Sequence, residues 1–383
     1  MKYYIISGEA SGDLHGSNLM RALLAREPQA QIRFWGGDRM GQVAADYPSV
    51  VQVRHIRDLA YMGIVEVLSH LREIYGNIRF CKQDIMRFAP DVMVFIDYPG
   101  FNLKIAKFTH AHHIRNVYYI SPQIWAWKKG RIRPMRRDLD RLCYILPSEL
   151  DFYAKNNFPQ AVYVGHPLLD EVERYRSNNV GTGNKLPTVV DGRRRIAFLP
   201  GSRKQELRRM LPLMVQLAKR HPEYHFTIAA MSLIGSDFYN TYLPTGCSNI
   251  DLLYDRTYDI LDSSYAAVVC SGTATLETGL FRVPQVVCYQ CNRLSAFIAR
   301  ILIGNSIKYI SLVNLIADRP IVTELIQSDF NDAVLDDEFR KITADQSNRS
   351  RILQGYDRLI DILQGSGASQ RTADIITQKL NQQ

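Results

Sequence analysis

The chain has few cysteines and no long apolar run, and both absences limit what it can be. Its six cysteines among 383 residues are scattered, mostly in apolar segments, which fits reduced thiols rather than a disulfide framework. Cys288 and Cys291 have the spacing of a metal or redox pair, but no second Cys/His pair lies nearby, so we interpret them as structural. No stretch approaches the roughly 18 apolar residues of a membrane-spanning helix. Too few apolar residues follow Lys2 for a secretory signal, so we expect a cytoplasmic protein.

The common nucleotide-binding fingerprints are missing as well. Gly8, Gly12 and Gly16 recur every four residues after the first apolar run, and no Gly-Lys-Ser/Thr occurs. This spacing departs from both the dinucleotide fingerprint and the Walker loop. Glycines between a strand and a helix still allow the backbone to pass close to a ligand.

Basic residues are in excess, with 47 Lys and Arg against 38 Asp and Glu and a net charge of +9. Such an excess predicts an anionic partner, which is a nucleic acid, an acidic membrane surface or a phosphorylated substrate. The chain is too long for one typical hydrophobic core, so two domains are expected.

Short apolar runs alternate with helical patterns in both halves, which predicts α/β domains with parallel sheets. The expected strands are Tyr3–Ile6, Ile32–Trp35, Val92–Ile96, Val117–Ile120, Leu142–Leu146, Ile196–Leu199, Phe226–Ala230, Ile250–Leu253, Ala266–Cys270, Gln285–Tyr289 and Tyr309–Val313. A polar stretch, 171–194, predicts a linker between domains of residues 1–170 and 195–355. Helices at about 360–383 can pack back on the first domain.

The turn after Ile196–Leu199 is a candidate anion site. Pro200 and Gly201 end the strand, and Ser202 is expected to cap the next helix in a capping box with Gln205. Unpaired N–H groups at a helix start attract anions, and Arg203 adds donors suited to phosphate. The alternative is an ordinary turn with a surface arginine.

A second turn of the same kind follows Ala266–Cys270. Ser271, Gly272, Thr273 and Ala274 offer N–H groups and hydroxyls to phosphate at a helix start. Glu277, one turn into that helix, can accept hydrogen bonds from both hydroxyls of a ribose. Two phosphate-type turns and one such acid in one half predict a nucleotide site.

In the first half, Asp97 directly follows an apolar strand, where ligands bind in such sheets. It is either a helix cap or a catalytic base. A later stretch combines aromatic and basic residues, which suits a lipid headgroup, a phosphate or a nucleic acid, or else forms a solvated basic helix. It contains Trp125, Trp127, Lys128, Lys129 and Arg131.

Three further segments each allow two interpretations of their role. The apolar helices predicted at 59–75 and 293–308 are either buried or in contact with a membrane. Asp138 and Asp140 match an Asp-x-Asp metal motif, but flanking arginines favour ion pairing, so no metal site is expected there.

The ordered motifs resemble the lipid-A-disaccharide synthase family, which is similar in architecture to glycosyltransferases with two Rossmann-like domains facing across a cleft (GT-B). The resemblance covers about Tyr3 to Ile326. The motifs are Ser7-Gly-Glu-Ala-Ser-Gly-Asp13, Asp97-Tyr-Pro-Gly-Phe-Asn102, Ser121-Pro-x-x-Trp-Ala-Trp127, Val164-Gly-His-Pro167, Leu199-Pro-Gly-Ser-Arg203, Ser271-Gly-Thr-Ala-x-x-Glu277 and Asn314-Leu315.

The resemblance implies an inverting transfer between two acylated sugars at the inner membrane of a Gram-negative bacterium. The donor would be UDP-2,3-diacylglucosamine, and the acceptor 2,3-diacylglucosamine 1-phosphate. The protein would be peripherally bound to that membrane, without a metal or other cofactor, and a homodimer is possible.

The resemblance also implies residue roles. Asp97 would be the general base, with Glu9 or Asp13 as the competing candidate. Basic residues from Lys128 onward would meet the acceptor phosphate. The UDP-binding residues would be Gly201, Ser202, Arg203, Ser271, Gly272, Thr273, Ala274, Glu277 and Asn314.

Two rival functions remain at this point. A UDP-sugar 2-epimerase of the same fold would use the nucleotide site without needing an acyl-binding surface. A basic nucleic-acid-binding protein would explain the charge, but no RNA- or DNA-binding motif supports it.

Overall fold

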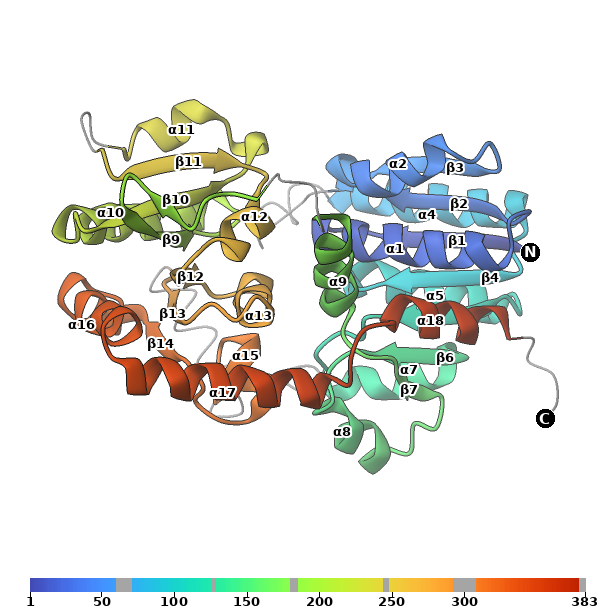
Figure 1. Cartoon of the computed structure of the whole chain (residues 1–383). Coiled ribbons are helices and arrows are strands. Elements are labelled where there is room, and N and C mark those ends of the chain that lie inside the picture. The colour runs from blue at the N-terminus through green and yellow to red at the C-terminus, as the bar shows by residue number, and fades with distance from the viewer. Residues whose placement is uncertain (60–70, 125–128, 180–184, 244–247, 292–307, 379–383) are drawn as a thin grey trace. The chain divides into compact units, whose positions relative to one another are not determined.

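The computed structural model describes residues 1–59, 71–124, 129–179, 185–243, 248–291 and 308–378. The chain forms two compact units, one of Met1–Pro167 with Ser366–Gln383 and the other of Leu168–Gly365. In each unit a parallel sheet is joined through helices (Figure 1). This architecture confirms the prediction of two doubly wound α/β domains.

The first unit has a parallel sheet with strand order β3-β2-β1-β4-β5-β6-β7. Its elements are β1 (Lys2–Ser7), α1 (Ala10–Arg26), β2 (Gln31–Gly36), α2 (Asp38–Ala45), β3 (Val50–His55), α4 (Leu71–Phe88), β4 (Val92–Ile96), α5 (Pro99–Ala111), β5 (Arg115–Tyr119), α7 (Ile132–Asp138), β6 (Arg141–Tyr144), α8 (Glu149–Lys155), β7 (Ala161–Tyr163) and α18 (Ala368–Thr377).

Both faces of this sheet are buried, which explains the unbroken apolar runs of its strands. Tyr3 and Ile5 of β1 belong to a core shared with α1, α2 and α18. Tyr4 and Ile6 point to the opposite core, shared with α4, α5 and α7. Side chains that alternate along one strand therefore fill two different cores.

Helix α18 packs along α1 although the two are far apart in sequence (Figure 1). Arg26 of α1 and Asp374 of α18 form an ion pair with 2.6 Å between Nε and Oδ1. The Arg115 guanidinium donates hydrogen bonds to the carbonyl oxygens of Ile375 and Ile376, both at 2.8 Å. A cation at the last turn satisfies carbonyls that have no partner within the helix.

The second unit has the strand order β11-β10-β9-β12-β13-β14, with β8 antiparallel to β9. Its elements are α9 (Pro167–Asn179), β8 (Val189–Val190), β9 (Arg193–Leu199), α10 (Lys204–Arg220), β10 (Tyr224–Ala230), α11 (Ser236–Asn240), β11 (Ile250–Tyr254), α12 (Thr257–Asp262), β12 (Ala266–Cys270), α13 (Thr273–Leu280), β13 (Gln285–Tyr289), α15 (Leu312–Ala317), β14 (Thr323–Ile326), α16 (Asp332–Thr343) and α17 (Gln346–Leu363).

The boundary between the units lies after Pro167, ahead of the linker expected at 171–194. That stretch begins inside α9, which packs on the second unit. The Tyr175 hydroxyl donates to Asp259 Oδ1 at 2.8 Å, and Arg176 donates to the Leu280 carbonyl at 2.9 Å. The first part of the predicted linker, up to Asn179, is therefore helical, and residues 180–184 lie outside the described residues.

The last strand of the second sheet differs from the prediction. Tyr309–Val313 was predicted as a strand, but α15 begins within that segment, because Ser311 Oγ accepts a hydrogen bond from the Asn314 backbone N–H at 3.2 Å. The strand at this edge is β14 instead, which pairs with β13.

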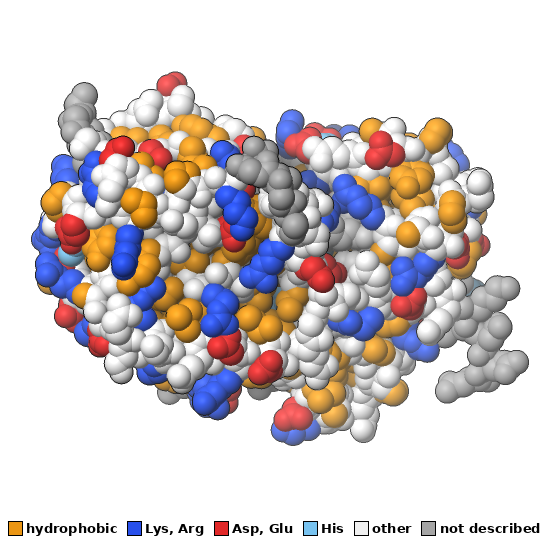
Figure 2. All heavy atoms as spheres, in the orientation of Figure 1, with side chains coloured by type: hydrophobic (Ala, Val, Ile, Leu, Met, Phe, Trp, Pro, Cys, Tyr) orange, Lys and Arg blue, Asp and Glu red, His pale blue; other side chains and the backbone are white. Residues whose placement is uncertain are grey.

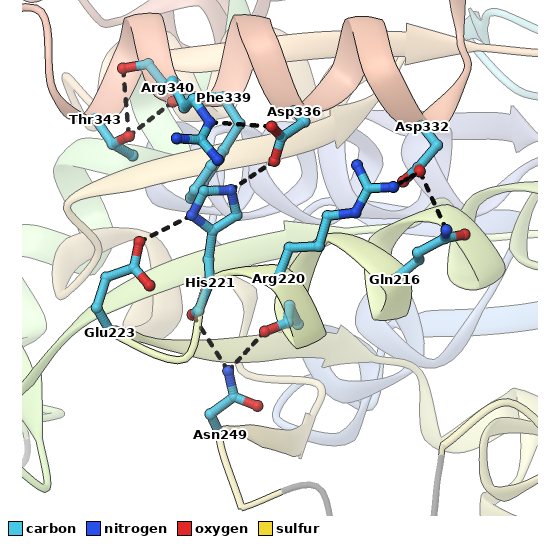
Figure 3. A network of polar contacts seen from close by, with 11 residues as sticks. Gln216, Arg220, His221, Glu223, Asn249, Asp332, Asp336, Phe339, Arg340 and Thr343 are labelled. Atoms are coloured by element: carbon cyan, nitrogen blue, oxygen red, sulfur yellow. Dashed lines mark hydrogen bonds and ion pairs between the residues drawn. The ribbon is translucent and has the colours of Figure 1, made fainter.

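Helix α10 is anchored at its C-terminal end by a polar network (Figure 3). His221, directly after the helix, contacts Asp336 of α16 with 2.7 Å between Nε2 and Oδ1, and Arg220 pairs with Asp332. Burial opposes the ionisation of Asp336, but hydrogen bonds from His221 and Arg340 outweigh it and lower its pKa. This network fixes the helix whose other end lies at the candidate site.

Candidate active site

Each sheet has one place where the strand order reverses, and the candidate site residues gather at these two switch points. In the first unit the switch lies between β1 and β4, which are followed by Glu9 and Asp97. In the second it lies between β9 and β12, which are followed by the turns at Gly201 and Gly272. Ligands of open α/β sheets bind at the carboxyl ends of strands at such points.

The backbone at Asp97 is held in an unusual conformation. Asp97 and Tyr98 have φ values of 44° and 49°, in the left-handed region that costs energy for residues with side chains. The Asp97 carbonyl accepts hydrogen bonds from Asn102 Nδ2 at 2.7 Å and from the Tyr118 hydroxyl. These two contacts to one carbonyl oxygen keep the turn in place after β4.

The carboxyl group of Asp97 is tuned by its surroundings. Burial is the main reason that its pKa rises to about 6, and the negative charge of Glu9 raises it further. The two acids come from adjacent strands of one sheet, as the switch point requires. A carboxylate with such a pKa is ionised at neutral pH yet a better proton acceptor than an ordinary aspartate.

The first glycine of the glycine-rich stretch has a steric role. A Cβ atom at Gly8 would lie 2.3 Å from Cγ of Tyr98, so the ring of Tyr98 packs directly on this backbone. Tyr98 also stacks on Phe101, with 5.7 Å between ring centroids. The glycine thus brings the turns after β1 and β4 together.

Asp13, the third candidate base, has a structural role. Its Oδ1 accepts hydrogen bonds from the N–H groups of Gly37 and Met40 at 2.6 and 3.1 Å, and its Oδ2 from that of Arg39 at 3.0 Å. The buried carboxylate therefore serves the first turn of α2. We remove it from the candidate bases.

His166 of the Val164–Pro167 motif and His15 of α1 also lie close together in the first unit. Burial, and then the charge of His15, lower the pKa of His166 to about 3. Both side chains are buried. His166 is therefore a neutral imidazole at physiological pH, a feature that the sequence did not reveal.

The turn after β9 differs in detail from the prediction. The N-cap of α10 is Arg203 rather than Ser202, and the acid that bonds back to the turn is Glu206 rather than Gln205. Glu206 Oε2 accepts hydrogen bonds from the N–H groups of Ser202 and Arg203 at 2.9 and 3.2 Å. The Arg203 side chain is 58% exposed, so its guanidinium is accessible to a ligand.

The turn after β12 presents its backbone to solvent. Gly272, the N-cap of α13, and Thr273 are exposed. The Ser271 hydroxyl, expected at the phosphate, donates to the Ile310 carbonyl at 2.8 Å instead. Ser271 therefore ties this turn to the segment ahead of α15, and the backbone N–H groups of Thr273 and Ala274 are the anion donors that the helix start provides.

Glu277 is oriented by a tyrosine that the sequence did not single out. The Tyr258 hydroxyl of α12 donates to Glu277 Oε1 at 2.8 Å. The Tyr258 ring packs against Tyr175 and Phe281, with centroids 5.6 and 5.2 Å away. Aromatic packing thereby fixes the hydroxyl that holds the carboxylate.

Asn314, predicted to bind UDP, is buried and fully hydrogen-bonded within the protein. Its Nδ2 donates to the Val322 carbonyl and to Glu324 Oε1, both at 2.9 Å. Its Oδ1 accepts from the N–H groups of Ile321 and Val322 at 2.8 and 3.0 Å. Since an amide has two N–H bonds and two lone pairs, this side chain has no group left for a nucleotide.

The aromatic and basic stretch is described only in part. Trp125, Trp127 and Lys128 lie outside the described residues, and so does the Lys129 side chain. Arg131 precedes α7 and lies near Tyr118: burial and then the charge of Asp97 raise the pKa of Tyr118, and the charge of Arg131 opposes them. A cation of this stretch thus acts on the tyrosine whose hydroxyl donates to the Asp97 carbonyl.

Both acids of the Asp-x-Asp sequence have partners within the protein. Asp138 pairs with Arg137, with 2.6 Å between Oδ1 and Nε, and Asp140 Oδ2 accepts from the Asn116 N–H at 2.7 Å. Within the described ranges, no group of three or more His, Cys, Asp or Glu side chains is arranged to hold a metal ion.

Known proteins resemble this chain over nearly its whole length. The family model for lipid-A-disaccharide synthetase matches residues 3–376. The lipid-A-disaccharide synthase of Syntrophus aciditrophicus (strain SB) is 37% identical over 379 residues, which cover 96% of this chain and 95% of that protein.

Two solved structures share the fold. The UDP-GlcNAc 2-epimerase from Neisseria meningitidis bound to UDP-GlcNAc has a TM-score of 0.68 and 11% identity, covering 99% of this chain and 100% of that one. The glycotransferase of kitacinnamycin has a TM-score of 0.65 and 15% identity, covering 98% of each chain. These two likenesses concern the fold alone, whereas the family match and the identity to the synthase show that the chain belongs to the lipid-A-disaccharide synthetase family.

Proposed function

We propose that the chain transfers the sugar of UDP-2,3-diacylglucosamine to the 6-hydroxyl of 2,3-diacylglucosamine 1-phosphate. The products are the β-1,6-linked disaccharide 1-phosphate and UDP. Family membership supports the reaction. The observation that carries the mechanism is the Asp97 carboxyl, whose pKa of about 6 is set by burial and by Glu9.

Asp97 acts as the general base. It takes the proton of the acceptor hydroxyl while that oxygen attacks the anomeric carbon from the face opposite UDP. The bond to UDP breaks with its electrons on the β-phosphate oxygen, and the configuration at the anomeric carbon is inverted. A raised pKa strengthens the base without protonating it at neutral pH.

The second unit binds the nucleotide. The first turn of α13 and the Arg203 guanidinium supply positive charge to the diphosphate as it leaves, which is work that other transferases assign to a metal ion. Glu277, held by Tyr258, accepts hydrogen bonds from the ribose hydroxyls. The reaction on this proposal needs no metal.

A basic and aromatic groove on the first unit supports contact with the inner membrane. It lies between α4 and α5, has a volume of about 980 Å³ and is lined by three cations and no acid. Tyr75 and Met86 in this lining are 65% and 49% exposed, and Lys82 lies 4.8 Å from the centroid of Phe108. Cations beside exposed apolar side chains suit an anionic lipid surface.

The chain on this proposal binds the membrane peripherally. Among helices of the described residues, none is both long and apolar enough to cross a bilayer. Flotation with vesicles that contain anionic lipid should recover the protein, and flotation with neutral vesicles should recover less. Equal recovery from both would contradict an electrostatic contact.

The decisive experiment measures UDP release from UDP-2,3-diacylglucosamine in excess EDTA, with and without the acylated sugar phosphate. We expect release that requires the acceptor and persists in EDTA. Loss of activity in EDTA would overturn the metal-independent mechanism, and release without acceptor would indicate an epimerase or hydrolase.

A nucleic-acid-binding function has less support. On the face drawn in Figure 2, Lys and Arg side chains are interspersed with Asp and Glu and with apolar patches, and form no continuous stripe. Salt-dependent binding of arbitrary RNA, without any response to UDP, would favour that function.

A further inference from the structure

A carboxylate of the protein occupies the anion position of the first phosphate-type turn. Glu206 Oε2 accepts hydrogen bonds from the N–H groups of Ser202 and Arg203, at 2.9 and 3.2 Å. Its Oε1 lies 3.9 Å from Nη1 of Arg203. Glu206 therefore uses the same donors that a phosphate would use at this turn.

The turn is shaped to admit this side chain. Gly201 has a φ of 109°, and a Cβ atom there would lie 2.4 Å from Oε2 of Glu206. Any other residue would be strained in this conformation and would also displace the carboxylate. The contact is therefore built into the turn.

The charge of Glu206 extends to the second turn. Burial is the main reason that the pKa of Cys270 rises to about 12, while Glu206 raises it further and Arg203 lowers it. Cys270 is the last residue of β12, directly before Ser271 and the start of α13. Glu206 and Arg203 thus both act on the strand end from which the second turn begins.

We infer that Glu206 determines how strongly the site binds phosphate. Its carboxylate occupies the turn after β9, so the diphosphate binds at the turn after β12. Glu206 and the diphosphate then both interact with Arg203. This inference rests on the proposed nucleotide site. A negative charge on the shared arginine weakens the hold on a diphosphate and favours its release. The uridine part of the ligand carries no charge and does not sense Glu206.

The test is the substitution Glu206→Gln. Glutamine also serves at this position of a capping box, so the turn can keep its shape without the charge. Calorimetry with UDP, UMP and uridine should show that the variant binds UDP about fivefold more tightly than the wild type does. The gain should be smaller for UMP and absent for uridine. Asp361→Asn removes an exposed charge from α17 and should change none of the three affinities.

Several outcomes would overturn the inference. Equal weakening of UDP and uridine, with a lower melting temperature, would make Glu206 only a helix cap. Unchanged UDP affinity in a variant with wild-type melting temperature would show that the charge does not reach the phosphates. If the wild-type chain bound neither UDP nor uridine, the proposed nucleotide site itself would be wrong, and that failure is visible before any variant is made.

Discussion

The two switch points have the same topology and opposite chemistry. In the first unit, β1 and β4 end in acids, and the pKa of Asp97 rises because of burial and the charge of Glu9. In the second unit, β12 ends in a turn with exposed backbone, and the turn after β9 carries the exposed guanidinium of Arg203 while its own N–H groups bond to Glu206. The same architecture thus carries a candidate proton acceptor in the first unit and anion donors in the second. The difference lies in a few residues of the turns.

The acids at the two switch points, Asp97 and Glu206, also differ in their hydrogen bonding. Asp97 has its backbone fixed by Tyr118 and Asn102, while burial and the charge of Glu9 raise the pKa of its carboxyl and outweigh one hydrogen bond from the Tyr98 N–H. Glu206 has its carboxylate satisfied by two N–H groups of its own turn. A carboxylate that is bonded to N–H groups is a poor base, whereas one that is partly desolvated is a better one. This contrast supports the proposal that the first unit supplies the base and the second unit binds the nucleotide.

The largest effect is expected from Asp97→Asn. The amide cannot accept the acceptor proton, so turnover should fall about a thousandfold. UDP affinity should stay at the wild-type value, since the proposal assigns Asp97 to proton transfer and not to the nucleotide. Steady-state rates and calorimetry on one preparation separate the two effects. Substantial turnover in this variant would move the base to Glu9.

A smaller effect is expected from Arg203→Ala. Loss of a charged donor should weaken UDP binding roughly ten- to hundredfold. Arg208→Ala is the matched control, because its guanidinium lies 5.9 Å from the centroid of Phe238 and has packing available within the protein. Equal losses in both variants would mean that general positive charge, rather than Arg203, holds the diphosphate.

The ribose contact is tested by Tyr258→Phe, which removes only the hydroxyl that orients Glu277. We expect UDP binding about fivefold weaker, in keeping with one hydrogen bond. The preference for UDP over 2′-deoxy-UDP should shrink as well, which a purely structural role would not cause. Tyr175→Phe is the control, because its hydroxyl donates to Asp259 instead. A deoxy preference retained in Tyr258→Phe would separate Glu277 from the ribose.

Much of the fold was predictable because both faces of the sheets are buried. Val92–Ile96 and Ala266–Cys270 are buried at every position, and such strands must be apolar throughout. The run Tyr309–Val313 was wrongly predicted as a strand because Ser311 caps a helix there. This local contact outweighs strand propensity. The start of the stretch 171–194 belongs to α9, because polarity does not distinguish a linker from a helix solvated on one side.

The site was predictable where it is local in sequence. Turns after apolar strands were found from Gly201 and Gly272, and the acid at a strand end from Asp97. Contacts between distant residues were not found, because one sequence does not show which side chains meet. Tyr258 meets Glu277 from another helix, and Asp13 meets the start of α2. Glu206, and not the predicted Gln205, bonds back to the turn, because a shift of one residue in the helix start decides which side chain reaches the turn.

The smallest effect, and the one that most directly tests the like-charge pair, is expected from Glu9→Gln. The base must be ionised, so kcat/KM of the wild type should fall as the pH drops through about 6, the pKa of Asp97. Removing the negative charge of Glu9 makes ionisation of Asp97 easier, so this acidic limb should move to lower pH by roughly half a unit. The rate at pH 8 should change little, because Asp97 is ionised there in both proteins. Glu27→Gln, which removes an acid paired with the N-terminus, should leave the limb in place. If Glu9→Gln instead abolished turnover at every pH, Glu9 would be the base. Asp97, with its raised pKa, would then only be a neighbour of the catalytic residue.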